Sequence, residues 1–269
     1  MLGSIIGDIC GSVYEWHSFK TENPDKIPLN DINSFFTDDS VLTVATAEAI
    51  LTQQDYASTY KKWARRYPNS GYGGDFYLWM KSDCVVPYYS WGNGSAMRVS
   101  PVGWAFETLE ETLAEAKRSA EVTHDHPEGI KGAQATAAAI FMARHDADKP
   151  EIKRYIESTF GYNLSRATRD IRPGYSFDVS CQGSVPESII SFLESRDYEH
   201  AVRLAISLGG DADTMACIAG GIAEAFYREI PEKRIYFARM GLAADMLDVI
   251  DRFTAFLKTG NADAPPANF

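Results

Sequence analysis

Apolar and small side chains recur at intervals of three and four residues along most of this 269-residue chain. That spacing places them on one face of an α-helix, whereas a half-buried strand needs apolar and polar residues in alternation. Alternating runs are scarce, so the pattern predicts an all-α fold. The predicted helices cover about residues 2–16, 38–53, 55–66, 74–81, 95–106, 110–120, 127–144, 150–158, 186–195, 197–208, 213–228, 231–239 and 241–258.

Two of these helices have recognisable start signals. The segments Ser184–Glu187 and Asp125–Glu128 each have a polar residue, a proline two positions later and a glutamate three positions later. A proline in the first turn and a capping box both favour a helix start. We therefore expect helices to begin at these two segments.

Three predicted helices are unusually rich in small residues. Gly3, Gly7 and Gly11 recur every four residues in the first, and glycines and alanines crowd the segments 132–139 and 216–225. Small side chains let helix axes approach closely, which would allow ligands from distant helix ends to meet at one centre. Tight core packing by itself would produce the same pattern.

The segments 17–36, 67–73, 82–94 and 159–183 lack regular periodicity and hold many of the prolines, glycines and aromatic residues. Loops between rigid helices are where binding sites are commonly built. No linker or change in composition divides the chain, so we expect one domain over residues 1–258 and a frayed tail over 259–269.

Charge and composition narrow the functional classes. The formal net charge is −11, and no stripe of Lys and Arg with interleaved aromatics offsets it, so generic nucleic-acid binding is disfavoured. The first helix is interrupted by Asp8 and Glu15 and lacks the flanks of a signal peptide. No run reaches the roughly 18 apolar residues of a membrane span. We expect a cytoplasmic protein.

The cysteines fit a reducing compartment. None has the CxxC or CxxH spacing of a metal or redox motif, and most lie among apolar or small residues, so we expect buried free thiols. They are Cys10, Cys84, Cys181 and Cys217.

Two acidic segments, Thr37–Ser40 and Gly209–Thr214, each precede a run of small apolar residues that is predicted to be helical. Carboxylate and hydroxyl oxygens of this kind are suited to hard divalent cations. Each segment taken alone is also a common helix cap. The candidate ligands are Thr37, Asp38, Asp39, Asp211, Asp213 and Thr214.

The choice of metal follows from the donor atoms. If the two segments meet, like charges within about 4 Å would cost on the order of 1–4 kcal/mol per pair without a cation. Neither segment contains His or Cys, which argues against zinc. Mg²⁺ is the best match, with Mn²⁺ or Ca²⁺ next, and four carboxylates exceed what one Mg²⁺ ordinarily takes, which favours two ions.

Two further acids lie in the first predicted helix. Glu15 follows Asp8 by seven residues, two helical turns, so both should face the same side. We expect Asp8 to have a surface or capping role. Glu15 could instead reach the metals or orient a water molecule.

Two polar segments are candidates for ligand binding. The loop Trp91–Arg98 combines paired glycines with a following helix, and such backbone amides suit a phosphate, although Gly-Asn-Gly is also an ordinary turn signal. The segment Thr123–Glu128 has two histidines beside a helix start. We expect His124 to hydrogen-bond a ligand oxygen or to cap locally rather than to bind metal.

With these residues in place, the chain resembles the ADP-ribosylglycohydrolase family. The matching motifs follow the family's order and span nearly the whole chain. They are Gly3–Gly11 with Glu15, Thr37–Ser40, Gly92–Arg98, Thr123–Glu128, Val185–Glu187 and Gly210–Thr214.

The resemblance implies a compact single-domain orthogonal bundle of helices, with a cleft at helix N-termini that holds two Mg²⁺ ions. The six oxygen-donor residues above match metal ligands, and Glu15 matches an acid at the metal centre. Gly92, Asn93, Gly94, Ser95 and His124 match diphosphate and ribose contacts. Adenine would stack on Trp91 or Tyr175.

The activity implied is metal-assisted hydrolysis of the bond between ADP-ribose and an acceptor, with Glu15, Asp38 or Asp39 orienting or deprotonating the water. A protein arginine side chain is the first acceptor hypothesis. The alternatives are another ADP-ribose linkage, to serine, a nucleic-acid base or a small metabolite, and a non-catalytic ADP-ribose-binding protein.

Overall fold

The computed structural model describes residues 1–259, and these form helices and no strand, with one isolated bridge between Gly92 and Ser180. The all-α prediction is confirmed. Beyond Thr259, the predicted tail lies outside the described residues. The α-helices are α1 Leu2–Gly11, α2 Asp38–Thr52, α3 Tyr56–Arg66, α4 Gly74–Lys81, α5 Gly94–Met97, α6 Ser100–Ala105, α7 Leu109–Glu121, α8 Pro127–Arg144, α9 Lys149–Phe160, α10 Thr168–Ile171, α11 Cys181–Glu194, α12 Tyr198–Ile206, α13 Ala212–Tyr227, α14 Glu232–Gly241 and α15 Ala244–Thr259, with short 3-10 segments at Glu15–His17 and Pro24–Lys26.

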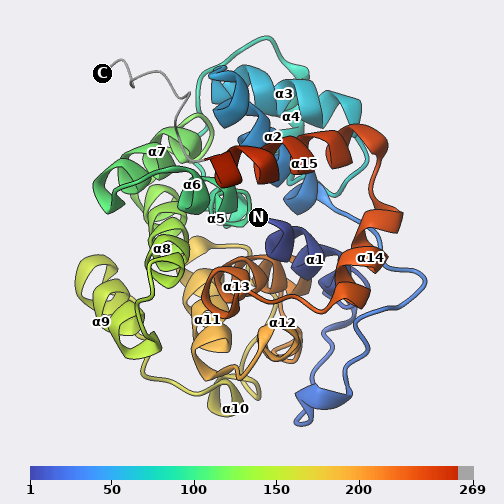
Figure 1. Ribbon diagram of the computed structural model, residues 1–269, viewed down its shortest axis with the longest axis vertical. Coiled ribbons are helices and arrows are strands. Elements are labelled where there is room, and N and C mark those ends of the chain that lie inside the picture. The colour runs from blue at the N-terminus through green and yellow to red at the C-terminus, as the bar shows by residue number, and fades with distance from the viewer. Residues whose placement is uncertain (260–269) are drawn as a thin grey trace.

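The centre of the molecule is the pair α1 and α13, which pack along each other (Figure 1). A Cβ added at Gly3 would lie 2.6 Å from the Gly220 carbonyl oxygen, and one at Gly11 would lie 2.5 Å from the Ala212 carbonyl oxygen. Only glycine fits such an approach of two backbones. The small-residue pattern therefore brings the two helices close together, as expected.

Other helices surround this pair. α8, α11 and α12 pack against α13, and α2 lies against α1, while α15 covers α2 (Figure 1). Alanines of α8 such as Ala135 and Ala138 are fully buried. The two acidic segments begin α2 and α13, so their ends are set by the packing around α1.

Several predicted boundaries were wrong. The first helix ends at Gly11 rather than continuing to 16, because the chain turns before the 3-10 segment Glu15–His17. The predicted helix 95–106 is two short helices, α5 and α6, the second with Pro101 in its first turn. The short helix α10 falls in a segment predicted to be irregular.

The two predicted start signals also act differently. α11 begins at Cys181, with the Ser180 side chain accepting a hydrogen bond from the Gly183 amide, and Pro186 lies inside the helix. At α8 the first-turn proline is confirmed, but the cap is His126, whose Nδ1 accepts from the Glu128 amide. The Asp125 carboxylate instead accepts from the Tyr89 amide.

The thiols are free, as predicted, and Cys10, Cys181 and Cys217 are buried. The prediction of burial was wrong for Cys84, which is exposed because it lies in the irregular segment after α4. Within the described part of the chain, no helix has the length and apolar character needed to cross a bilayer.

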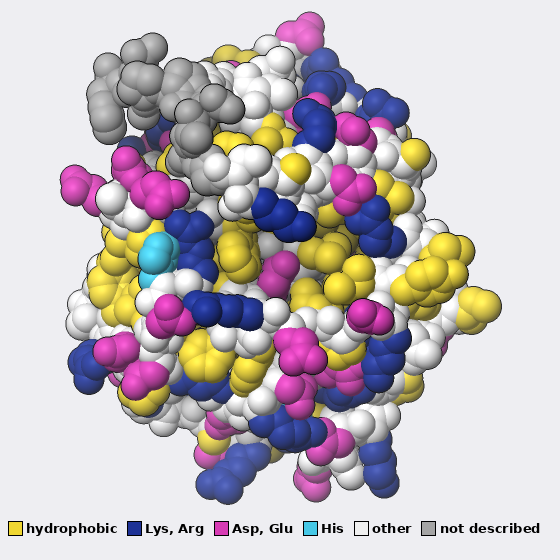
Figure 2. All heavy atoms as spheres, in the orientation of Figure 1, with side chains coloured by type: hydrophobic (Ala, Val, Ile, Leu, Met, Phe, Trp, Pro, Cys, Tyr) yellow, Lys and Arg dark blue, Asp and Glu magenta, His cyan; other side chains and the backbone are white. Residues whose placement is uncertain are grey.

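Charged side chains are mixed on the face that Figure 2 shows, where Lys and Arg are scattered among Asp and Glu. The expectation that the protein does not bind nucleic acids generally stays a prediction.

Candidate active site

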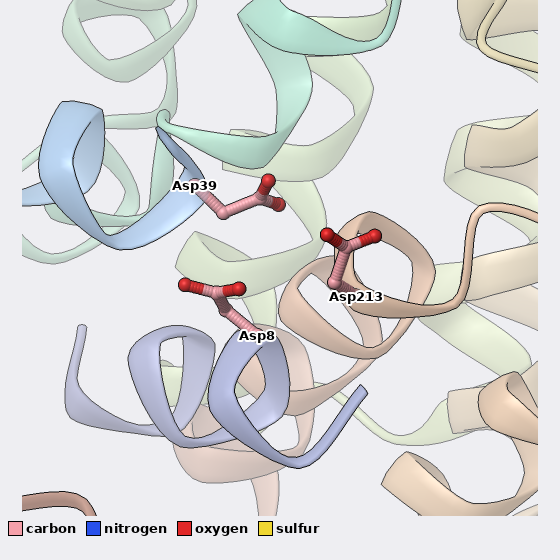
Figure 3. Close-up of side chains that lie close together, drawn as sticks. All are labelled: Asp8, Asp39 and Asp213. Atoms are coloured by element: carbon pink, nitrogen blue, oxygen red, sulfur yellow. The ribbon is translucent and has the colours of Figure 1, made fainter. Parts of the chain in front are cut away.

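Three carboxylates from three helices converge at the centre of the fold. Asp8 of α1, Asp39 of α2 and Asp213 of α13 point toward one another (Figure 3). One oxygen of each lies within 4.8 Å of the other two, and all three side chains are buried. The predicted meeting of the two acidic segments therefore occurs, with a third acid from α1 between them.

Asp8 is the residue whose environment the sequence misjudged. It is fully buried, so the surface role was wrong. The capping role is confirmed in an unexpected form, because Asp8 caps a different helix: its Oδ2 accepts from the backbone amides of Thr37 at 3.0 Å and Ser40 at 3.1 Å. One signal could have placed it, since Gly11, three residues later, marks the face of α1 that packs on α13.

A second group of three acids shares one member with the first. Oxygens of Glu15, Asp211 and Asp213 also lie within 4.8 Å of one another. Glu15 lies in the 3-10 segment after α1, so the prediction that it shares one helix with Asp8 was wrong. Its carboxylate nevertheless lies close to the second acidic segment, as expected. The Asn93 side chain donates to Asp211 at 2.7 Å and thereby orients it.

The remaining candidate ligands surround these groups. The Thr37 hydroxyl donates to Asp8 at 2.7 Å, and the Thr214 hydroxyl donates to Asp39 at 3.3 Å. Asp38 lies in the first turn of α2 and lines the same cavity, but it belongs to neither group of three. The structure thus adds Asp8 to the predicted centre. Asp38 lies beside it, since burial, and then repulsion from Asp213 and Asp8, raises the pKa of Asp38 well above its usual value.

The electrostatics of the cluster are unfavourable for carboxylates alone. Burial raises the pKa of Asp8 to about 6 and of Asp211 to about 6. Burial, followed by repulsion from Asp213 and Asp8, raises the pKa of Asp39 well above its usual value. Burial and the neighbouring Asp213 raise the pKa of Glu15 to about 8.

The donor set fits a divalent cation. Among the described residues, none of these carboxylates forms an ion pair with Lys, Arg or His. The Oδ1 atom of Asp39 is buried and has no hydrogen-bond partner within that part of the chain, although buried polar atoms are rarely left unpartnered. Oxygen donors with excess negative charge are those that Mg²⁺, Mn²⁺ and Ca²⁺ prefer.

All of these acids except Asp8 line a cavity of about 530 Å³. Gly92, Asn93, Gly94 and His124 line it together with the acidic segments. It is also lined by aromatic residues that the sequence analysis did not assign to a site: Trp16, Phe35, Tyr72, Phe76, Tyr88 and Phe177. Trp16 is 74% exposed and stacks on Phe177 with 5.7 Å between ring centroids.

Three predicted ligand contacts lie outside the lining of this cavity. The Ser95 hydroxyl is buried and donates to the Gly129 carbonyl. Tyr175 donates to the Gly183 carbonyl and packs against Gly210. Trp91 is 53% exposed beside Gly92 and contacts the His126 ring edge. Of the two aromatic candidates for adenine, Trp91 is the more exposed and directly precedes the glycine loop, whereas Tyr175 is partly buried.

The fold and the sequence motifs agree with the match of this chain to the sequence profile of a known family. The profile of the ADP-ribosylglycohydrolase family matches residues 1–258. The chain therefore belongs to the ADP-ribosylglycohydrolase family, whose members are enzymes that hydrolyse glycosidic bonds.

Particular relatives are distant. The chain is 24% identical to the ADP-ribosylhydrolase ARH3 of Mus musculus, with 86% of this chain and 84% of that protein covered. It is 25% identical to the ADP-ribosylarginine hydrolase Tri1 of Pseudomonas putida, with 84% and 69% covered. A solved structure described as an ADP-ribosylglycohydrolase-related protein complex is similar in fold, with a TM-score of 0.72, 24% identity, and 96% and 95% of the two chains covered.

Proposed function

We propose that this protein is a Mg²⁺-dependent hydrolase that releases ADP-ribose from an acceptor. The observation that carries the proposal is the pair of three-carboxylate groups sharing Asp213 at the base of one cavity, in a chain of this family. A shared carboxylate between two acid groups is the arrangement expected around two cations.

The proposed cation ligands are Asp39, Asp211 and Asp213, with Asp38 and the hydroxyls of Thr37 and Thr214 beside them. When bound, the cations supply positive charge that fixes the ribose hydroxyls and stabilises negative charge at the attacking oxygen. Asp8 holds Thr37 and Ser40 in place through its hydrogen bonds. It therefore acts on the centre by fixing the start of α2.

Glu15 is our candidate for proton transfer. Asp8, Asp39 and Asp213 are buried, whereas Glu15 is only partly so and lines the cavity. A general base must reach the proton of a water molecule directly. We propose that the Glu15 carboxylate accepts the proton of the water that attacks the anomeric carbon, with Asp38 and Asp39 as the alternatives.

The part of the cavity lined by the glycine loop, next to Asp211, suits the nucleotide. The backbone of Gly92–Gly94 and the ring of His124 line it, and backbone amides are common phosphate donors. We propose that the diphosphate lies on this loop. We favour Trp91 over Tyr175 for stacking on adenine, because the Tyr175 hydroxyl and ring are already engaged by Gly183 and Gly210.

Arginine remains our first acceptor hypothesis. It is supported by the relative named as an ADP-ribosylarginine hydrolase and by acids such as Glu15 and Asp75 along the cavity, since carboxylates favour a cationic guanidinium. Linkages to serine, a nucleic-acid base or a small metabolite are the alternatives. A non-catalytic ADP-ribose-binding protein is a further alternative, disfavoured by the retained acids.

An acceptor panel tests the function. ADP-ribosyl-arginine, ADP-ribosyl-serine and nucleotide conjugates would be incubated with the protein, with Mg²⁺ and with a chelator, and released ADP-ribose measured. We expect release from the arginine conjugate that is lost with the chelator. Binding of ADP-ribose without release from any conjugate would favour the binding protein instead.

The site assignment is tested by the double variant Asp211→Ala with Asp213→Ala. We expect turnover to fall at least 100-fold, as removal of electrostatic stabilisation in active sites does, and bound metal measured by elemental analysis to be lost. The matched control removes two exposed carboxylates of α15, Asp248→Ala with Asp251→Ala, whose surface ion pairs contribute little. Full turnover and retained metal in the first variant would show the assignment to be wrong.

A further inference from the structure

Arg98 directly follows α5 and is among the residues that line the cavity. Its side chain is fully buried, with the guanidinium 4.3 Å from the centre of the Tyr60 ring. Its Nη2 atom donates to the Ser119 carbonyl at 2.9 Å and to the Thr123 hydroxyl oxygen at 2.8 Å. The Nη2 donor is thus committed to Ser119 and Thr123, and through Thr123 Arg98 can act on the next residue of the chain.

Thr123 connects Arg98 to the cavity. Its oxygen accepts from Arg98, and the same oxygen lies 2.8 Å from Nδ1 of His124. Acceptors close to the Thr123 hydroxyl include His124 Nδ1 at 2.8 Å and the Ala120 carbonyl at 3.5 Å. The shorter bond is stronger, and a proton on Nδ1 would leave the Thr123 hydroxyl proton only the long contact to the Ala120 carbonyl. The Thr123 hydroxyl therefore donates to Nδ1.

This bond leaves the ring proton on the other nitrogen. A neutral imidazole carries one N–H, and accepting at Nδ1 places it at Nε2. Burial, together with the charge of Arg98, lowers the pKa of His124 well below its usual 6.5, so the ring is neutral. Within the described residues Nε2 has no hydrogen-bond partner, and it lies where a Cβ added at Gly94 would be 3.1 Å away.

We infer that Arg98 and Thr123 are positioning residues that hold His124 as the Nε2–H tautomer, so that one neutral N–H donor faces the ligand at the Gly92–Gly94 loop. A donor in this place suits an oxygen acceptor. The identity of that acceptor as a phosphate or ribose oxygen rests on the proposed function, whereas the tautomer does not. The absence of a side chain at Gly94 leaves room for the contact.

The test reads the tautomer directly. Long-range proton–nitrogen NMR spectra of protein labelled with ¹⁵N at histidine distinguish a protonated from an unprotonated ring nitrogen, and the His124→Asn variant assigns the signal among the five histidines. We expect Nδ1 unprotonated and Nε2 protonated at pH 7.5 in the unaltered protein. Protonation at Nδ1, or at both nitrogens, would overturn the inference without any variant being needed.

Variants test the residues that set the tautomer. In Thr123→Val we expect the preference for Nε2–H to be lost, and in Thr123→Ser we expect it to be kept, since serine restores the hydroxyl. The matched control is Thr136→Val, a buried threonine whose hydroxyl has no partner among the described residues. An unchanged tautomer in folded Thr123→Val would contradict the role of Thr123.

Ligand binding gives a second and separable readout. With Mg²⁺ present, we expect Thr123→Val to weaken the affinity for free ADP-ribose by about fivefold to tenfold, the effect of one hydrogen bond, and Thr123→Ser and Thr136→Val to leave it unchanged. An unchanged affinity in Thr123→Val would contradict the proposed contact. Failure of the unaltered protein to bind ADP-ribose would instead count against the proposed function, while the tautomer result would stand.

Discussion

Asp213 is the residue on which the candidate site depends most. It belongs to both groups of three acids, and it lies at the start of α13, where Thr214 donates its amide to the same carboxylate. Burial, and then repulsion from Asp211 and Asp8, raises its pKa well above the usual value. A raised pKa of an acid means that the folded state disfavours its charged form. Metal-free protein is therefore destabilised at this position.

We predict that Asp213→Asn stabilises the metal-free protein. At pH 8 in chelator, the free energy of unfolding should rise by on the order of 1 kcal/mol, since one of the crowded charges is removed. The stabilisation that Mg²⁺ gives the unaltered protein should disappear. Denaturant unfolding with and without Mg²⁺ measures both effects, with the exposed Asp251→Asn as control. A variant that still gained stability from Mg²⁺ would contradict the prediction.

At the scale of elements, the contact between α1 and α13 sets the geometry of the acids. Gly7 lies so close to the backbone of Ala216 and Cys217 that no side chain would fit between them. Asp8 is the next residue along α1, and Asp213 lies at the start of the partner helix. The distance between the helices therefore determines whether the two carboxylates can meet.

We predict that Gly7→Ala lowers the free energy of unfolding by at least about 1–3 kcal/mol, because the added methyl group overpacks a rigid backbone contact. It should also weaken Mg²⁺ binding, since α1 must move away from α13. The matched control is Gly241→Ala in α14, where an added Cβ meets nothing within 4 Å; helix propensity makes that change neutral or slightly stabilising. Equal unfolding curves for the two variants would refute the argument.

The helices were predicted best where packing and periodicity agree. The spacing of apolar residues in α2, α3, α4 and α8 predicted their extents closely. Elements with short or interrupted runs were missed or misplaced, including α5, α6 and the start of α11. There the boundary depends on contacts distant in sequence, such as the Asn93 amide donating to the Val179 carbonyl, and a local pattern does not contain this information.

At the scale of the whole molecule, pH dependence of stability should depend in part on an ion cluster remote from the cavity. Glu199 of α12 accepts from Arg203 at 2.9 Å and from Arg234 of α14 at 2.7 Å. Burial alone would raise the pKa of Glu199, but the hydrogen bonds from the two arginines outweigh it and hold the value at about 2. The folded state thus favours the charged carboxylate.

We predict that Glu199→Gln lowers the free energy of unfolding at pH 7 by roughly 1 kcal/mol. This is less than the contribution of a fully buried charged hydrogen bond, because solvent screens the Glu199 ion pairs. An acid whose pKa is lower in the folded state stabilises the fold at pH values above its unfolded pKa, about 4.3 for glutamate. This contribution is lost as the pH falls toward the folded pKa of about 2. The difference in free energy of unfolding between the unaltered protein and Glu199→Gln should therefore shrink as the pH is lowered through this range. Denaturant unfolding from pH 7 to pH 2.5 measures this difference, with Glu121→Gln as control, because the Glu121 side chain is 39% exposed and, among the described residues, pairs only with a lysine of its own helix. A difference independent of pH would contradict the assignment.

The sequence by itself determined the helical class, the family, and most of the oxygen donors of the centre, because helical periodicity and short acidic motifs are local properties. Tertiary structure decided which acids share a site. It placed Asp8 inside the cluster and left Ser95 and Tyr175 outside the lining of the cavity. The physical reason is that side-chain burial and direction depend on how closely α1 and α13 approach, and that distance follows from the whole packed core.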